Sequence, residues 1–152
     1  MGGGQHTSVS KNRRAGFLSA LESHEIPLDE SLVVDCETSP AGGEAAIARV
    51  INSSDPPTAV VCFTDLVALG VLSGLHHRGY VPGKDMAVAS CDDIEEASRG
   101  YVQLTTARIQ KSEIGRKSAE MLLERIADPT LPPRRVLLEP ELIVRKTCGS
   151  RS

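Results

Sequence analysis

The fold of this chain is decided by residues 57–93, which read PTAVVCFTDLVALGVLSGLHHRGYVPGKDMAVASCDD. Two apolar runs, residues 59–63 and 86–91, are each closely followed by an acidic residue. Residues 66–78, which lie between them, have the apolar spacing of a helix. This order predicts a βαβ unit with carboxylates at the carboxyl ends of both strands. Ligands bind just outside those ends in open α/β sheets, so the segment points to a small-molecule cleft.

The rest of the chain continues this alternation. Further helices are predicted over residues 8–24, 44–52 and 112–127. Further strands or extended pieces are predicted over residues 31–36, 104–107, 136–138 and 142–145. Alternation of this kind predicts an α/β fold with a parallel sheet covered on both faces. The chain opens on a turn and a helix without a preceding strand, so we expect a first strand to be missing and the chain to be a piece of something longer.

Length and composition bound the possible functions. The 152 residues are one domain's worth of chain, and an apolar content of 40% suffices for a core. The net charge of −3 gives no basic surface for nucleic acid, and aromatic residues at 3%, without tryptophan, argue against a base-stacking platform. No apolar run is long enough for a transmembrane helix. The start, MGGGQHTSVSKNRR, lacks the apolar region of a signal peptide.

The four cysteines, Cys36, Cys62, Cys91 and Cys148, have no CxxC or CxxH spacing. Metal sites need clustered ligands, so we expect reduced structural thiols, no metal and a reducing cytoplasm. The histidines also lack metal spacing, and no Ser/His/Asp arrangement or phosphate loop is visible. We therefore expect neither an enzyme nor a cofactor.

Four segments, taken in order, carry a resemblance to a known family. They are GGGQHTSVSKNRRAGFLSAL, the stretch from GGEAAIARV to MAVASCDD, LTTARIQKSEIGRKSAEMLLERI and PELIVRKTC. With their natural spacing, they make the chain similar to the effector-binding core of the lactose-repressor/galactose-repressor (LacI/GalR) family of bacterial transcriptional regulators. The similarity covers nearly the whole sequence.

This resemblance implies a type I periplasmic-binding-protein-like fold, of which the chain would hold mainly the second lobe. Residues 1–110 would form the incomplete C-terminal effector-binding subdomain. Residues 111–132 would be a crossover helix toward a missing lobe, residues 133–148 returning strands, and residues 149–152 a tail. A small effector such as a sugar would bind between the lobes. Operator DNA would bind through an absent helix-turn-helix domain, and a homodimer would couple effector binding to it allosterically.

The resemblance also implies three effector-binding residues. Arg13 matches the family's effector arginine, and a guanidinium suits hydroxyls, carboxylates or phosphates. Asp92 matches the effector aspartate, whose carboxylate can accept two strong hydrogen bonds. Thr64 stands where the family often has a ligand-binding asparagine. The alternatives are a solvated surface arginine for Arg13 and a turn cap for Asp92.

Other positions have weaker implied roles. Phe63 is expected in the core or the cleft wall, and Asp65 is expected to cap the following helix near the cleft. Ile109 is a further cleft candidate, Asp93 is expected to cap or brace its loop, and the family suggests Leu69 for a dimer contact. Thr64 in place of asparagine leaves open the identity of the sugar and whether the effector is a sugar, and Ser90-Cys91 in place of the family's glycine and aromatic pair before the two aspartates predicts a wider pocket there.

One rival is a periplasmic sugar-binding protein of a transport system, which shares the fold. The LTT segment, the terminal PELIVRKTC and the cysteines favour the regulator.

Two local expectations remain for the described elements. Ser8 or Ser10 would cap the first helix, and residues 40–43 would form a turn.

Overall fold

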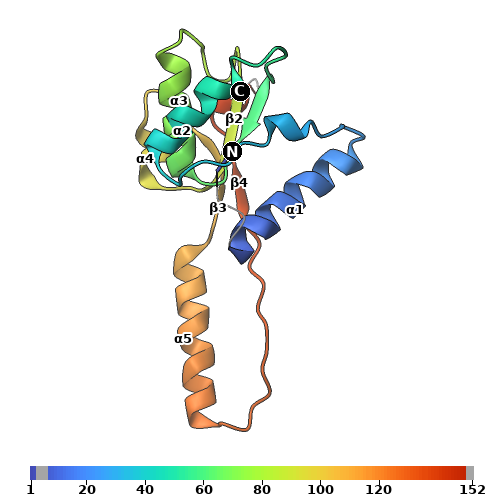
Figure 1. Ribbon diagram of the computed structural model, residues 1–152. Coiled ribbons are helices and arrows are strands. Elements are labelled where there is room, and N and C mark those ends of the chain that lie inside the picture. The colour runs from blue at the N-terminus through green and yellow to red at the C-terminus, as the bar shows by residue number, and fades with distance from the viewer. Residues whose placement is uncertain (3–6, 150–152) are drawn as a thin grey trace.

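The computed structural model of the protein describes residues 1–2 and 7–149 (Figure 1). The helices are α1 (Ser8–Ser23), α2 (Pro40–Val50), α3 (Asp65–His76), α4 (Glu95–Arg99) and α5 (Lys111–Ala127). The strands are β1 (Ala59–Val61), β2 (Ala87–Asp92), β3 (Thr105–Arg108) and β4 (Glu141–Ile143). The 3-10 turns are η1 (Glu30–Leu32) and η2 (Lys146–Cys148). None of the described helices is long and apolar enough to cross a membrane.

The sheet has the order β1-β2-β3-β4 among the described residues. Its first three strands are parallel, with Val60 paired to Val88 and Ser90 paired to Thr106. β4 is antiparallel to β3, with Ala107 opposite Leu142. The predicted βαβ unit is therefore confirmed, and it continues into a third parallel strand. The carboxyl ends of β1 and β2 meet at one edge, which is the edge where ligands bind in such sheets.

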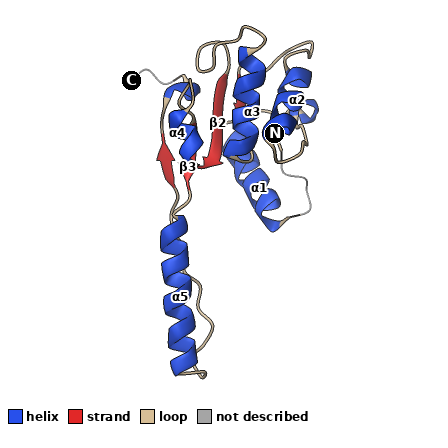
Figure 2. Cartoon of the chain, turned by 90° about the vertical axis from the view of Figure 1, so that its left-hand side faces the viewer, coloured by secondary structure: helices blue, strands red, loops and turns tan. Residues whose placement is uncertain are grey.

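The core lies where α2 and α3 pack on one face of the sheet (Figure 2). The two helices approach so closely that a Cβ at Gly70 would lie 1.8 Å from the Pro40 carbonyl oxygen, and one at Gly43 2.1 Å from the Val67 oxygen. Glycine is therefore required at both positions. The buried apolar side chains of this layer are Val34, Ala46, Ile47, Val50, Val60, Cys62, Val67, Ala68, Val71, Leu72, Leu75, Met86, Val88, Ala97 and Leu104.

An arm projects from the sheet at the carboxyl end of β3 (Figure 1). The chain leaves β3, runs out along α5 and returns in an extended segment to β4. No described residue of α5 is buried, and the apolar side chains Leu122, Leu123 and Ile126 are 60–67% exposed. The return is fixed at η2 by the buried Thr147, whose hydroxyl donates to the Val88 oxygen at 2.7 Å and accepts from the Thr105 N–H at 2.9 Å.

The strands predicted over residues 31–36 and 136–138 are wrong. The first segment begins within η1, and its backbone bond to another described segment comes from Gly2, whose N–H donates to the Val34 oxygen at 3.0 Å. The second segment runs beside α5 without a strand partner among the described residues. Residues 142–145 are partly confirmed, because β4 covers Glu141–Ile143. A strand forms only where a neighbour supplies hydrogen bonds, and apolar composition does not reveal that neighbour.

Helix starts also differ from the sequence prediction. The turn expected at residues 40–43 is the first turn of α2, because Ser39 caps it and proline at the first helical position has no N–H to lose. α1 is capped by Thr7, whose hydroxyl oxygen accepts from the Ser10 N–H at 3.1 Å, rather than by Ser8 or Ser10. Since both serines lie inside the helix, their own N–H groups are among those that need a cap.

Candidate functional site

Arg13 and Asp92 meet at the carboxyl edge of the sheet. Arg13 lies in the second turn of α1, and Asp92 is the last residue of β2. The Arg13 Nη2 donates to Asp92 Oδ1 at 2.8 Å, and the two side chains are 26% and 25% exposed. The structure thus brings together the two residues that the family motif singled out, although they are 79 positions apart in the sequence.

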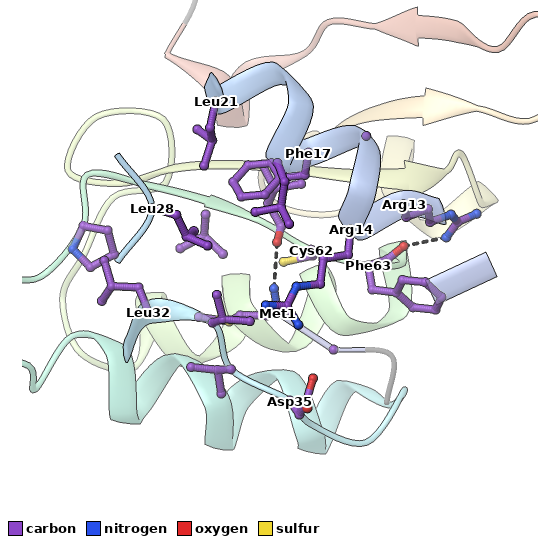
Figure 3. Close-up of a pocket in the computed structure, with 18 of the residues that line it drawn as sticks. Met1, Arg13, Arg14, Phe17, Leu21, Leu28, Leu32, Asp35, Cys62 and Phe63 are labelled. Carbon is purple, nitrogen blue, oxygen red and sulfur yellow. Dashed lines mark hydrogen bonds between the residues drawn. The ribbon is translucent and has the colours of Figure 1, made fainter. Parts of the chain in front are cut away.

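Phe63 forms the third side of this site. The Arg13 Nη1 donates to the Phe63 carbonyl oxygen at 2.5 Å, and its guanidinium carbon lies 4.8 Å from the centre of the Phe63 ring (Figure 3). A cation over an aromatic face is attracted by the negative charge of that face. Phe63 is half-buried and so borders the site instead of filling the core. The arginine is therefore held in place while part of its guanidinium reaches solvent.

Thr64 caps α3, which Asp65 was expected to do. The Thr64 hydroxyl oxygen accepts from the Val67 N–H at 3.4 Å, and the Thr64 backbone is extended as a cap requires. A capping hydroxyl still has its own proton to donate. Thr64 can therefore offer a hydrogen bond at the edge next to Phe63 while it stabilises the helix.

Asp65 has a different role from the predicted helix cap. It is fully buried, and its carboxylate accepts from the hydroxyls of Ser90 and Thr106 and from the Ile94 N–H. These three partners lie on β2, on β3 and in the loop after β2. The correction follows from geometry, since Asp65 points into the sheet while Thr64 stands at the helix end. Asp65 thus ties the start of α3 to the ends of two neighbouring strands.

The turn after β2 has an unusual backbone. Asp92 and Asp93 both have positive φ, at 123° and 48°. Residues with a side chain seldom adopt such angles, and they persist where the surroundings hold them. The surroundings here are the Asp65 bond to Ile94 and a pair of arginines on Asp93. The turn presents Asp92 toward α1 and turns Asp93 in the opposite direction, toward the arm.

Asp93 is braced by Arg108 and Arg145. The Arg108 Nε and the Arg145 Nη2 each donate to its carboxylate at 2.7 Å. Burial raises the pKa of the Asp93 carboxyl, but the hydrogen bonds and charges of the two arginines outweigh it and hold the pKa below its ordinary value. Arg145 also donates to the Leu104 oxygen at 2.8 Å. The expected bracing role of Asp93 is confirmed, and its partners are the residues that flank the arm.

Sequence reasoning did not assign roles to Ser90, Thr106, Arg108 or Arg145. All four act through contacts between segments that are at least 15 residues apart. The available signal was that all four belong to the quoted family segments, which include MAVASCDD, LTTARIQ and PELIVR.

The remaining candidates lie away from the ion pair. Ile109 is half-buried directly after β3, at the root of the arm, and no described contact joins it to Arg13 or Asp92. Leu69 is half-buried on α3, where the neighbouring Leu66 is 44% exposed. Neither the cleft role of Ile109 nor the dimer role of Leu69 is tested by these placements. Within the described ranges, no three His, Cys, Asp or Glu side chains are grouped as a metal site.

Comparison with known proteins gives the class of protein that this fold and site define. Residues 1–148 match the family model of the periplasmic binding protein-like domain, so the chain belongs to that family. Within it, the sequence resemblance to LacI/GalR regulators is confirmed. The chain is 32% identical to the ribose operon repressor of Haemophilus influenzae over 94% of its own length and 43% of the repressor. It is 33% identical to the transcriptional repressor PurR of Vibrio atlanticus, over 89% and 40% respectively.

Solved structures give the same answer. A LacI-family transcriptional regulator from Enterococcus faecium with bound ribose superposes with a TM-score of 0.81 at 27% identity, over 92% of this chain and 52% of that one. The transcriptional regulator CelR in complex with cellobiose has a TM-score of 0.89 at 28% identity, over 97% and 45%. The chain therefore spans about half the length of the relatives it matches.

Proposed function

We propose that this chain is the effector-sensing half of a LacI/GalR-type transcriptional regulator, which acts as a repressor and binds a sugar or related metabolite. The observation that supports this is the Arg13–Asp92 pair, held at the ligand-binding edge of the sheet and partly open to solvent. Two structural neighbours contain ribose and cellobiose. A polyol needs both a fixed donor and a fixed acceptor, and this pair supplies them side by side.

Breaking the Arg13–Asp92 ion pair so that both groups can bind a ligand costs little free energy. Ion pairs that are partly exposed contribute on the order of 1 kcal/mol or less, because water already solvates both groups. Hydroxyl groups of a sugar can accept from the Arg13 guanidinium and donate to the Asp92 carboxylate in charge-assisted hydrogen bonds. The Thr64 hydroxyl and the Phe63 ring complete a site with polar and apolar parts, as sugar recognition requires.

The turn that carries Asp92 offers a route from ligand to the rest of the regulator. Asp92 faces the ligand, while Asp93, its neighbour, is held by Arg108 and Arg145 at the root of the arm. A ligand that prefers one arrangement of this turn shifts the arm, and such a preference is all that allosteric coupling requires. Operator DNA would be bound by a separate helix-turn-helix domain and not by this chain. We place the regulator in the cytoplasm as a homodimer, with Leu69 on α3 at the contact.

A periplasmic sugar-binding protein is the second candidate. The relatives favour the regulator, because the ribose operon repressor and PurR are both transcriptional repressors.

The test uses the complete regulator. A thermal-shift screen of mono- and disaccharides, beginning with ribose and cellobiose, identifies the effector, and calorimetry measures its affinity. We expect Arg13→Ala and Asp92→Ala to abolish the effector response in a fluorescence assay of operator DNA release, while operator binding without effector is kept. Arg14→Ala is the matched control, because Arg14 lies next to Arg13 on α1 but pairs with the exposed Glu30. A normal response from both site variants would overturn the site assignment.

A further inference from the structure

Asp65 is the centre of a buried hydrogen-bond network next to the turn that carries Asp92. Asp65 and Thr106 are fully buried, and Ser90 is only 5% exposed. Asp65 Oδ1 accepts from the Ser90 hydroxyl and, at 2.7 Å, from the Thr106 hydroxyl, while Oδ2 accepts from the Ile94 N–H at 2.9 Å. Because this carboxylate is closed off from solvent, it acts through these partners and not by touching a ligand.

Chemistry fixes the direction of the two hydroxyl hydrogen bonds. A carboxylate only accepts hydrogen bonds, so the hydroxyls of Ser90 and Thr106 must both donate to Asp65. The Thr106 oxygen then keeps its lone pairs for another donor, and the Asp93 N–H donates to it at 3.4 Å. Thr106 is therefore a bridge that connects the buried carboxylate to the backbone of the turn.

The network holds two successive backbone N–H groups of the turn. The Asp93 N–H is held by Thr106, and the Ile94 N–H is held by Asp65. These bonds fall at and directly after the two residues with positive φ, Asp92 and Asp93. A backbone of this kind persists only where its surroundings over-determine it. The two bonds therefore oppose relaxation of the turn to an ordinary backbone conformation.

The side chains of the network are anchored on three regular elements. Asp65 is the first residue of α3, Ser90 lies on β2 and Thr106 lies on β3. Ser90 and Thr106 are paired in the parallel ladder, so their hydroxyls are held side by side. Supports on helices and strands position a functional group more precisely than supports on loops. The sheet and α3 therefore act together as a rigid mount for the turn.

We propose that Asp65, Ser90 and Thr106 are positioning residues of the effector site. They hold the turn after β2 in the conformation that points the Asp92 carboxylate at Arg13 and at the effector, and they do not touch the effector themselves. This inference rests on the proposed function, because it takes Asp92 as an effector-binding residue. Without the network, the turn relaxes and Asp92 points elsewhere in part of the molecules. Only the fraction that keeps the native turn then binds, which lowers the apparent affinity.

A role in stability alone is the alternative, and the chain contains a matched example of it. Thr147 is fully buried, and its hydroxyl donates to the Val88 oxygen at 2.7 Å and accepts from the Thr105 N–H at 2.9 Å. Thr106 has the same burial, and its hydroxyl also donates one hydrogen bond and accepts one. The two threonines differ in that Thr106 is bonded to the turn and Thr147 is bonded elsewhere, so a comparison separates positioning from stability.

The experiment compares Thr106→Val with Thr147→Val in the complete regulator, and urea unfolding measures the stability that each variant loses. Hydrogen exchange of peptides over residues 92–94, followed by mass spectrometry, should be at least about tenfold faster in Thr106→Val than in Thr147→Val. Calorimetry uses ribose and cellobiose as probes. The sugar that the native regulator binds should bind Thr106→Val at least about tenfold more weakly than Thr147→Val. Thr106→Ser keeps the hydroxyl, so it should restore both slow exchange and affinity.

Ser90→Ala keeps the test decisive if Thr106→Val does not fold. It removes one donor to Asp65, and exchange over residues 92–94 should again be faster than in Thr147→Val. Equal exchange in the network variant and in Thr147→Val would overturn the inference, and so would native sugar affinity in a variant whose turn exchanges faster. A native regulator that binds neither sugar would count against the proposed function for these sugars. The exchange comparison needs no ligand, so it would still decide whether the network holds the turn.

Discussion

The guanidinium of Arg145 lies 2.7 Å from the carboxylate of Asp93, and both side chains are almost excluded from solvent, at 13% and 9% exposure. Arg145 follows the strand on which the arm returns, and Asp93 follows the residue proposed to bind the effector. One ion pair thus joins the ligand side of the molecule to the base of the arm. Buried pairs of this kind are costly to break, because the remaining charge is left without a partner.

Asp93→Asn should therefore lower the free energy of unfolding by about 2–4 kcal/mol. Asparagine tolerates the positive φ of this position, so the loss of stability reflects the removed charge and not backbone strain. Urea unfolding followed by circular dichroism measures it. Glu124→Gln is the control, because Glu124 pairs with Arg134 on the exposed arm, where loss of a pair should cost less than about 1 kcal/mol. Similar losses in the two variants would contradict the special role of Asp93.

The contribution of Asp93 should also depend on pH. The pKa of this carboxyl in the folded chain lies below its ordinary value, since Arg108 and Arg145 outweigh the effect of burial. A lowered folded-state pKa stabilises fully above the unfolded-state value, near about 4, and the stabilisation is lost as pH falls through the folded-state value. The difference between the native chain and Asp93→Asn should therefore be constant from about pH 7 to 5 and shrink below about pH 4. Urea unfolding at several pH values in this range measures it, and a difference that grew on acidification would refute this account.

The close contact of α2 and α3 gives a third prediction. Gly70→Ala should lower stability by about 1–3 kcal/mol or more, because the added Cβ meets a backbone carbonyl that cannot rotate away. Gly115→Ala in α5 is the matched control, since nothing lies within 4 Å of its added Cβ. Alanine there should raise stability by roughly 0.5–1 kcal/mol through helix propensity. Thermal unfolding of the two variants gives the sign of each effect, and equal signs would disprove the packing argument.

Thiol reactivity should rank the cysteines by environment. Burial raises the pKa of Cys62 to about 12, and burial also raises the pKa values of Cys36 and Cys91, which are only half-buried. The thiolate is the reactive form, so iodoacetamide at pH 8 should modify Cys62 last, at the rate at which the core opens. Mass spectrometry of peptides over time follows each site, and the differences should disappear in concentrated urea. Early modification of Cys62 would show that its thiol is not buried in the core.

The sequence predicted the centre of the fold better than its margins. Residues 59–63, 66–78 and 86–91 form β1, α3 and β2 with small shifts at their ends, because the buried pattern of this unit is complete within the segment. Residues 31–36 are also rich in apolar side chains but form no ladder, because among the described residues their backbone bond to another segment is the single one from the Gly2 N–H to the Val34 oxygen. Apolar composition indicates which faces of a strand are buried, whereas the hydrogen bonds at its edges depend on a neighbouring strand.

The same distinction applies to the site. Arg13 and Asp92 could be named from a motif, since both residue types and spacings are visible in the sequence. The bonds of Ser90 and Thr106 to Asp65, and of Arg145 to Asp93, exist only after three strands are aligned. For the same reason, local spacing predicts Asp65 as a helix cap. In the aligned sheet, Asp65 instead belongs to a buried hydrogen-bond network with Ser90 and Thr106.

Thr147 pins the returning chain inside the sheet, and this has a mechanical consequence for the arm. Residues 109–140 are attached through two adjacent antiparallel strands, β3 and β4, and not through a single linker. Attachment through two adjacent strands restricts how the arm can rotate relative to the sheet. The two strands permit swinging about one axis and resist rotation about the length of the arm. We therefore expect the arm to move mainly about one axis, so that a small change at its root becomes a directed displacement at its tip.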